Sequence, residues 1–253
     1  MEQDTQRRSC ATGPYSEISN VCAIGSKGMA HGAILGASLN AMLCAEGAYI
    51  RKLQKRCIIA SEGSTPQELV AVLSGLVKVS KSLHDGRTQI LGLKFPGEFI
   101  SLCSEAEPWF ASVDVVEDVT LLVLNASKSA RLRRENPQFN IDISAHANRE
   151  IAYAQAHLVT LGRRSPIERL ACLLIEFNDR GLGIKGASGH IRVPLARDQI
   201  GDYIGLKSET VSRQFTRLKS AGFISLISPS QVQVHNWPAL RQLSNGERPC
   251  TGA

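Results

Sequence analysis

The sequence lacks the features that mark several large classes of protein. No apolar run within its 253 residues approaches the roughly 20 residues that span a bilayer, so we expect no membrane segment. The N-terminus has no basic stretch followed by an apolar core, which argues against a secretory signal and favours a cytoplasmic location. No nucleophile–base pair and no metal-ligand spacing occurs, so we do not expect an enzyme.

The cysteines of the chain are widely spaced. The seven residues are Cys10, Cys22, Cys44, Cys57, Cys103, Cys172 and Cys250. Their number is odd and no Cys-x-x-Cys pair occurs, which argues against a disulfide framework in a chain of this length. A metal or iron–sulfur site would usually include at least one close pair. We therefore expect no metal and no cofactor, and we interpret most of these side chains as small hydrophobic groups.

Positive charge is concentrated in the C-terminal part of the chain. From residue 160 onward there are 13 Lys and Arg against 7 Asp and Glu, which accounts for the whole formal net charge of +6. An uneven basic surface is the electrostatic footprint that a nucleic-acid-binding region requires. Basic surfaces also occur without that function, so the charge supports this interpretation without establishing it.

Residues 196–224 have the pattern of two short helices around a tight turn. The first helix carries three apolar residues, Ile200, Tyr203 and Ile204. Gly205-Leu206-Lys207 forms the turn, in which glycine supplies the backbone freedom that a close bend needs. Ser208 is the expected N-cap of the second helix, because its hydroxyl can accept a hydrogen bond from a free amide of the first turn.

The second helix has one apolar face and several polar faces. Val211, Phe215 and Leu218 are four and three residues apart, so one face packs inward. The other faces carry Glu209, Thr210, Ser212, Arg213, Arg217 and Lys219. Such a helix can lie in the major groove of DNA, with its first residues at base edges and its later Arg and Lys on phosphates. The alternative is an ordinary surface helix with a solvated charged face.

The N-terminal half is predicted to contain a tail followed by a set of strands. Residues 1–45 are rich in Gly, Ala and Ser, so we expect a flexible tail with a short helix near residues 35–45. Residues 46–135 contain many short alternating stretches between turns, including a hairpin turn at Asp85-Gly86 and a break at Ser74-Gly75. This spacing predicts an antiparallel β-roll or sandwich.

Residues 136–164 have the period of a long helix. Its apolar seam is spaced four, three, four and three and comprises Ala147, Ile151, Ala154, Leu158 and Leu161. Small Ser144 continues the seam one heptad earlier. This regular seam predicts a two-helix dimer interface. The alternative is a helix that packs on its own sheet.

Residues 165–243 are predicted to form one further domain. Ser165 can cap a helix that continues to about residue 180, and Pro166 suits its first position, where a missing amide costs nothing. A short strand at 191–195 leads into the helix pair. Two further strands around Ser228-Pro229-Ser230 complete a winged helix-turn-helix, and residues 244–253 form a C-terminal tail.

This order of β-roll, long helix and winged helix-turn-helix resembles the CRP/FNR family of bacterial transcription regulators. The segments SPIERLACLLIEF and RDQIGDYIGLKSETVSR carry the resemblance, which covers residues from about 46 to 243 and is similar to the FNR and FixK branch in particular. It implies an α+β fold with a roll like that of a cyclic-nucleotide-binding domain. It also implies a homodimer that binds double-stranded DNA and works with RNA polymerase.

The recognition helix of that branch contains Glu-x-x-Ser-Arg, which here is Glu209-Thr210-Val211-Ser212-Arg213. The resemblance implies half-sites of TTGA type arranged as a palindrome. Arg213 can donate two hydrogen bonds to guanine, Glu209 can accept from an exocyclic amine, and Ser212 can contact a thymine edge. The expected contacts to the DNA backbone are Lys207, Ser208, Thr210, Arg217 and Lys219.

Two ligands of the family are not expected in this chain. Residues 103–112 correspond to the stretch with which cyclic-nucleotide-binding members hold the phosphate, and they contain no arginine and two carboxylates. Oxygen-sensing members hold an iron–sulfur cluster through closely spaced N-terminal cysteines and one cysteine in the roll. Cys10 and Cys22 are too sparse for such a cluster, and Leu122 stands where the roll cysteine is expected.

The leading hypothesis is therefore a dimeric activator of low-oxygen or nitrogen-fixation genes that has no obvious ligand and is controlled through its own synthesis. A repressor of the same fold is an alternative, as is a regulator that responds to haem or nitric oxide. Four histidines are available for a haem: His31, His84, His146 and His157. A β-roll whose main work is small-ligand sensing is a further alternative, against which the missing phosphate arginine argues.

Overall fold

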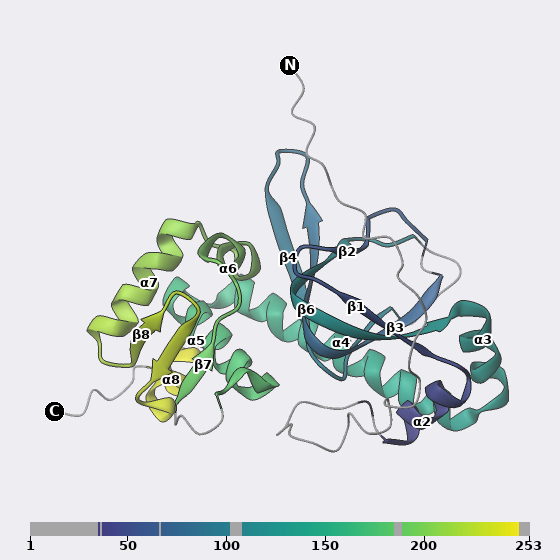
Figure 1. The fold of residues 1–253 in the computed structure, drawn as a ribbon. Helices are drawn as coiled ribbons and strands as arrows, with labels where there is room; N and C mark the ends of the chain where they lie inside the picture. The colour runs from purple at the N-terminus through teal and green to yellow at the C-terminus, as the bar shows by residue number, and fades with distance from the viewer. Residues whose placement is uncertain (1–34, 36, 66, 102–107, 185–188, 248–253) are drawn as a thin grey trace. The chain divides into compact units, whose positions relative to one another are not determined.

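A computed structural model describes residues 35, 37–65, 67–101, 108–184 and 189–247 (Figure 1). The chain forms two compact units, the first holding most residues up to Asn148 and the second those from Arg149 onward. Several positions singled out above lie outside the described residues, namely Cys10, Cys22, His31, Cys103 and Cys250. No helix in the described part of the chain is both long and apolar enough to cross a membrane.

The first unit is built on an antiparallel sheet, as the alternating sequence predicts. Its strands are β1 (Tyr49–Leu53), β2 (Ile58–Ala60), β3 (Glu68–Ser82), β4 (Thr88–Lys94), β5 (Phe99–Ser101) and β6 (Ser112–Asn125). The order is β1-β6-β3-β4, with β2 paired to β6 and β5 paired to β3. The register of β1 on β6 places Tyr49 opposite Val123 and Leu53 opposite Val119. This arrangement confirms the predicted β-roll and the α+β class.

The two faces of the sheet pack into separate apolar clusters. Along β6, Val119, Leu121 and Val123 contribute to the first cluster, together with Cys57. Leu122 and Leu124 point to the opposite side and contribute to the second cluster, with residues of the helices. This division follows from the two-residue period of a strand, which turns successive side chains to opposite faces.

Helix α2 (Ala37–Ala45) packs in the second cluster and is part of the first unit. Leu35, Leu39 and Leu43 are each at most 2% exposed. Leu39 and Leu43 are four residues apart and so lie on one side of the helix, and Leu35, which precedes the helix, packs in the same cluster with them and Phe139. The short helix expected near residues 35–45 is therefore confirmed, but it is not part of a flexible tail, because these leucines bury apolar surface in the core of the roll.

Strand β3 runs through the position where the sequence predicts a break. Gly75 has a φ of +89°, and a Cβ added there would lie 2.2 Å from the carbonyl oxygen of Asp118 in β6. The register between β3 and β6 shifts on both sides of Ser74. The glycine therefore marks a bulge at which two strands approach closely, and the predicted turn at Ser74-Gly75 is wrong.

Two consecutive helices follow the sheet. We did not predict the first, α3 (Ala126–Glu135), although Asn125 caps it by accepting a hydrogen bond from the amide of Ser127 at 2.9 Å. The second, α4 (Pro137–Arg163), agrees with the predicted long helix. The division between the two units falls within α4, after Asn148.

The second unit is the predicted winged helix-turn-helix. Its elements are α5 (Pro166–Phe177), η2 (Asn178–Leu182), β7 (His190–Arg192), α6 (Arg197–Ile204), α7 (Ser208–Ser220), β8 (Ile224–Ser228), β9 (Gln231–Val234) and α8 (Trp237–Ser244). The strands form a small sheet in the order β7-β9-β8. The start of α5 is as expected, with Pro166 in its first turn and Glu168 accepting a hydrogen bond from the amide of Ser165 at 2.9 Å. We did not predict α8.

Candidate DNA-binding interface

The turn between α6 and α7 depends on two glycines. Gly205 ends α6 in the left-handed conformation, with φ 66° and ψ 43°. The amide of Leu206 then donates to the carbonyl of Gly201 at 2.9 Å, which folds the turn back on α6. A Cβ on Gly201 would lie 2.3 Å from the carbonyl oxygen of Leu206, so this approach requires a residue without a side chain.

The inner side of α7 anchors it to the second unit. Val211, Phe215 and Leu218 are at most 1% exposed, as their spacing predicts. The guanidinium of Arg197 in α6 stacks on the ring of Phe215, with 3.5 Å between its carbon and the ring centroid. The helix begins at Ser208 with Lys207 in the N-cap position, so the prediction that Ser208 is the N-cap is wrong by one residue.

The side chains expected to contact bases lie on the outer side of α7. Glu209, Ser212 and Arg213 are all exposed. One Nη atom of Arg213 donates to the hydroxyl of Thr210 at 3.1 Å, which holds the guanidinium near the first helical turn. Thr216 is also exposed and lies one turn beyond Ser212 on the same side, and we did not single it out from the sequence.

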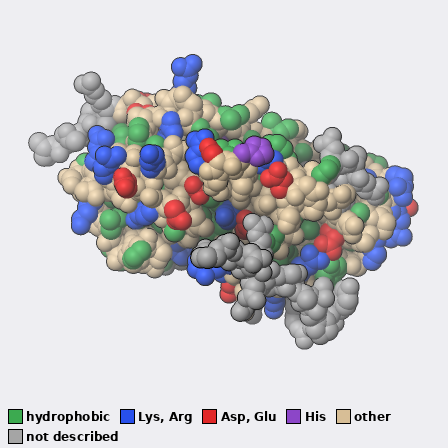
Figure 2. All heavy atoms as spheres, turned by 90° about the horizontal axis from the view of Figure 1, so that it is seen from above, with side chains coloured by type: hydrophobic (Ala, Val, Ile, Leu, Met, Phe, Trp, Pro, Cys, Tyr) green, Lys and Arg blue, Asp and Glu red, His purple; other side chains and the backbone are tan. Residues whose placement is uncertain are grey.

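The side chains expected to contact the DNA backbone lie beside those expected to contact bases. Lys207, Ser208, Arg217 and Lys219 are exposed, and Thr210 is half-buried. In the view of Figure 2, Lys and Arg side chains stand out at the left, over the second unit, interspersed with Asp and Glu. The arrangement places basic groups beside a polar helix face, which suits contact with phosphates on either side of a groove.

The apolar seam of α4 is largely uncovered in the single chain. Ile151 is 54% and Leu158 is 67% exposed, and Ala154 between them is exposed as well. Ala147 and Leu161 are half-buried. The alternative of a helix packed on its own sheet applies to the first turns only, because the buried residues of α4 are Phe139 and Ile143.

A half-buried histidine joins α4 to the helix pair within the second unit. His157 stacks on the ring of Tyr203 in α6, with 4.3 Å between the ring centroids and 16° between the ring planes. The Tyr203 hydroxyl donates to the carboxylate of Glu176 in α5, at 2.9 and 3.1 Å. The Nε2 atom of His157 is buried and has no hydrogen-bond partner among the described residues. The sequence offers no signal for this contact, since each residue comes from a different helix.

We expect His157 to make the second unit less stable in mild acid. Burial lowers the pKa of His157 below its ordinary value of about 6.5, and the charge of Glu176 and the backbone of Tyr203 offset this effect only in part. The unfolded chain therefore takes up the proton at a higher pH than the folded chain. The stability that neutral His157 contributes is complete above about pH 7 and is lost as the pH falls through 6.5 toward the folded-state pKa.

Urea unfolding at pH 7.5 and at pH 5.5 measures this effect. His157→Gln should reduce the loss of stability between the two pH values, whereas His84→Gln should not, because His84 is exposed. An unchanged pH dependence in His157→Gln would contradict the assignment.

Of the other histidines considered for haem, His146 makes an edge contact with the ring of Phe99, with 4.9 Å between the ring centroids.

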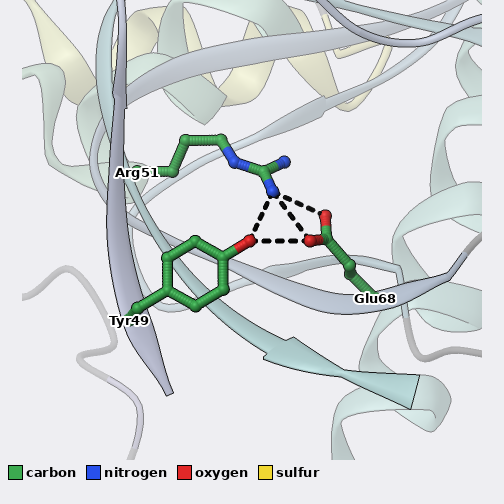
Figure 3. Close-up of polar contacts among 3 residues, drawn as sticks. All are labelled: Tyr49, Arg51 and Glu68. Carbon is green, nitrogen blue, oxygen red and sulfur yellow. Dashed lines mark hydrogen bonds and ion pairs between the residues drawn. The ribbon is translucent and has the colours of Figure 1, made fainter. Parts of the chain in front are cut away.

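A polar cluster in the first unit bears on ligand binding by the roll (Figure 3). One Nη atom of Arg51 donates to both oxygens of Glu68, at 2.7 and 2.8 Å, and to the hydroxyl of Tyr49 at 2.6 Å. The Tyr49 hydroxyl itself donates to Glu68 at 2.7 Å. Burial and the Glu68 carboxylate raise the pKa of Tyr49. The Arg51 charge is thus already compensated by a carboxylate, and an anionic ligand would have to displace that partner.

Comparison with known proteins gives consistent matches for both units. The family described as "Crp-like helix-turn-helix domain" matches residues 168–243, and "Cyclic nucleotide-binding domain" matches residues 50–136. The chain is 38% identical over 182 residues to the nitrogen fixation regulation protein FixK of Bradyrhizobium diazoefficiens, covering 69% of this chain and 76% of that protein. It is 32% identical over 174 residues to the transcriptional activatory protein AadR of Rhodopseudomonas palustris, covering 69% and 72%.

Among solved structures, that of FixK2 from Bradyrhizobium japonicum is similar, with a TM-score of 0.71 and 28% identity. The similarity covers 78% of this chain and 96% of that one. It therefore extends over nearly the whole of the solved protein.

Proposed function

Because the chain belongs to the CRP/FNR family of DNA-binding transcription regulators, we propose that it is a homodimeric activator of low-oxygen or nitrogen-fixation genes. Two relatives more than 30% identical are named as a nitrogen fixation regulation protein and a transcriptional activatory protein. We further propose that it acts in the cytoplasm on palindromes of TTGA type, and that RNA polymerase is its partner in activation.

The observation that supports this function best is the outer face of α7. Glu209, Ser212 and Arg213 are exposed together on its first turns, while the apolar side of the helix is buried. An α-helix fits the major groove, where arginine donates two hydrogen bonds to guanine and glutamate accepts from cytosine. The same three residues match the recognition sequence for which TTGA half-sites are expected.

The exposed seam of α4 supports the homodimer. Ile151 and Leu158 leave large apolar surfaces in water in the single chain, and a second copy of the helix would cover them. Two-fold pairing through α4 would place two recognition helices about one turn of DNA apart. A palindromic site follows from that symmetry.

We expect Arg213→Ala to weaken binding to a TTGA palindrome by roughly 1–3 kcal/mol and to relax the preference at the guanine. The physical reason is the loss of two hydrogen bonds that distinguish guanine from other bases. Binding-site selection from a randomised library measures the base preference, and titration of the selected site measures the affinity.

Arg217→Ala is the matched control, since it also removes one exposed arginine from α7. It should weaken binding to all sequences to a similar degree and lower the salt dependence by about one counterion. If Arg213→Ala kept the wild-type preference at the guanine, the base contact would be excluded and the proposed half-site would lose its chemical basis.

A further inference from the structure

The side chain of Arg169 in α5 joins the ends of two other helices. Its Nη2 donates to the carbonyl of Leu161 at 2.6 Å, and its Nε donates to the carbonyl of Arg164 at 2.9 Å. These carbonyls belong to the last turn of α4 and the residue that follows it. On the other side, Nη1 donates to the carbonyls of Ile204 and Gly205 at 3.1 and 3.3 Å, where α6 ends.

The chemistry of this contact suits arginine and no other residue. The last carbonyls of a helix have no partner within the helix and carry the negative end of its dipole, so a cation stabilises them. Two helix ends must be satisfied at once, and the planar guanidinium has donors pointing in several fixed directions. A lysine ammonium is a single point charge and would bind one helix end at the expense of the other.

The turn of the helix pair is in direct contact with this junction. A Cβ on Gly205 would lie 3.2 Å from the Arg169 Nη1 atom and 3.2 Å from Cδ2 of Leu161. Leu161 is a seam residue of α4, while Gly205 lies three residues before the start of α7. The end of the proposed dimer helix and the turn that leads into the recognition helix are therefore packed on one arginine.

The second unit contains the two surfaces that binding to a palindrome requires, one for pairing with a second subunit and one for contact with DNA. Residues 149–163 of α4 carry most of the seam, and α7 carries the recognition face. Helix α5 packs against both α6 and α7. In a two-fold dimer, the distance between the two recognition helices depends on the angle between α4 and α7 in each subunit.

We propose that Arg169 is a positioning residue for DNA recognition, which sets the angle between α4 and the helix pair and so determines the spacing between half-sites. The inference rests on the proposed function, because it presupposes a dimer that binds a palindrome. Arg169 does not contact DNA. It acts through the orientation of α7, and the His157–Tyr203 stack is a second contact between α4 and α6.

The test measures binding of wild type, Arg169→Ala and Arg169→Lys to palindromes whose central spacer is shortened or lengthened by one and two base pairs. Wild type should prefer one spacing. The preference is the ratio of the affinity for the best spacing to the affinity for an altered spacing. In both variants this ratio should fall by about two- to thirtyfold, the range for residues that couple two parts of a protein. Their base preference within a half-site should be unchanged, because the recognition face of α7 is intact.

Arg163→Ala is the matched control, since Arg163 is an exposed arginine at the end of α4. It should keep the wild-type spacing preference. Thermal unfolding of each variant sets a temperature at which all are folded, so that a difference in spacing preference is not a difference in folded fraction. Loss of base preference along with spacing preference would indicate a general structural role and would overturn the inference.

The outcomes separate the inference from the proposed function. If wild type bound no palindrome with sequence preference, the proposed function would fail and the inference with it. If wild type showed a sharp spacing preference and both Arg169 variants retained it, the inference alone would be overturned. If Arg169→Lys behaved as wild type while Arg169→Ala did not, charge alone would suffice and the bridging role of the guanidinium would be rejected.

Discussion

Gly201→Ala should destabilise the second unit, open the turn of the helix-turn-helix and so abolish specific DNA binding. The added Cβ would lie 2.3 Å from the carbonyl oxygen of Leu206, and backbone atoms cannot move aside as a flexible side chain can. The turn would have to open, which breaks the hydrogen bond between the Leu206 amide and the Gly201 carbonyl. Overpacking costs typically 1–3 kcal/mol and the lost hydrogen bond about 1 kcal/mol, so we expect a loss of about 3 kcal/mol in the free energy of unfolding.

Urea unfolding and DNA titration measure this prediction. Gly162→Ala is the control, because Gly162 lies within α4 and a Cβ there would meet nothing within 4 Å. It should leave stability unchanged or raise it by up to about 1 kcal/mol, the difference between alanine and glycine in a helix. Wild-type stability and binding in Gly201→Ala would show that the turn does not close as the structure describes.

The double substitution Ile151→Glu and Leu158→Glu should convert the proposed dimer to a monomer. Both side chains are more than half exposed in the single chain, so the folded subunit tolerates a charge at either position. In a paired α4 the four carboxylates would face each other and lose their water. The affinity for a palindrome should then fall by about two to four orders of magnitude. In a dimer, binding of one subunit holds the other close to the second half-site, and a monomer lacks this gain in effective concentration.

Light scattering after size exclusion measures the mass of the particle, and titration of a palindrome and of a single half-site measures the two affinities. Val159→Glu is the control, since Val159 is 54% exposed on α4 but lies off the seam. It should remain dimeric. A double variant that stayed dimeric would place the interface elsewhere, and it would also remove the basis for a spacing role of Arg169.

Much of the second unit could be predicted from local sequence. The burial of Val211, Phe215 and Leu218 follows from their spacing, and the start of α5 follows from Ser165 and Pro166. Such patterns are informative because a helix repeats every 3.6 residues, so neighbouring residues alone decide which face is apolar. The one-residue error at Ser208 is of the size expected for helix ends, where the boundary depends on the last few dihedral angles.

The first unit was harder to predict where a residue's role depends on a distant strand or helix. Gly75 was interpreted as part of a turn. A glycine is required there because the carbonyl of Asp118, more than forty residues later, leaves no space for a side chain. Similarly, the short helix that holds Leu39 and Leu43 was expected as part of a flexible tail, because the core that buries these leucines is formed by strands and a helix later in the chain. Composition describes the segment itself and contains no information on what will pack against it.

The sequence by itself therefore determined the class of each domain, the recognition helix and the apolar seam, because these depend on periodicity and on motifs within a few residues. Only the tertiary structure decided which glycines the turn requires, that Arg169 joins the ends of α4 and α6, and that His157 stacks on Tyr203. These contacts bring together backbone carbonyls and rings from separate helices. Their geometry is set by the packing of these helices against one another. The sequence of one helix contains no information on the residues of another helix that it will contact.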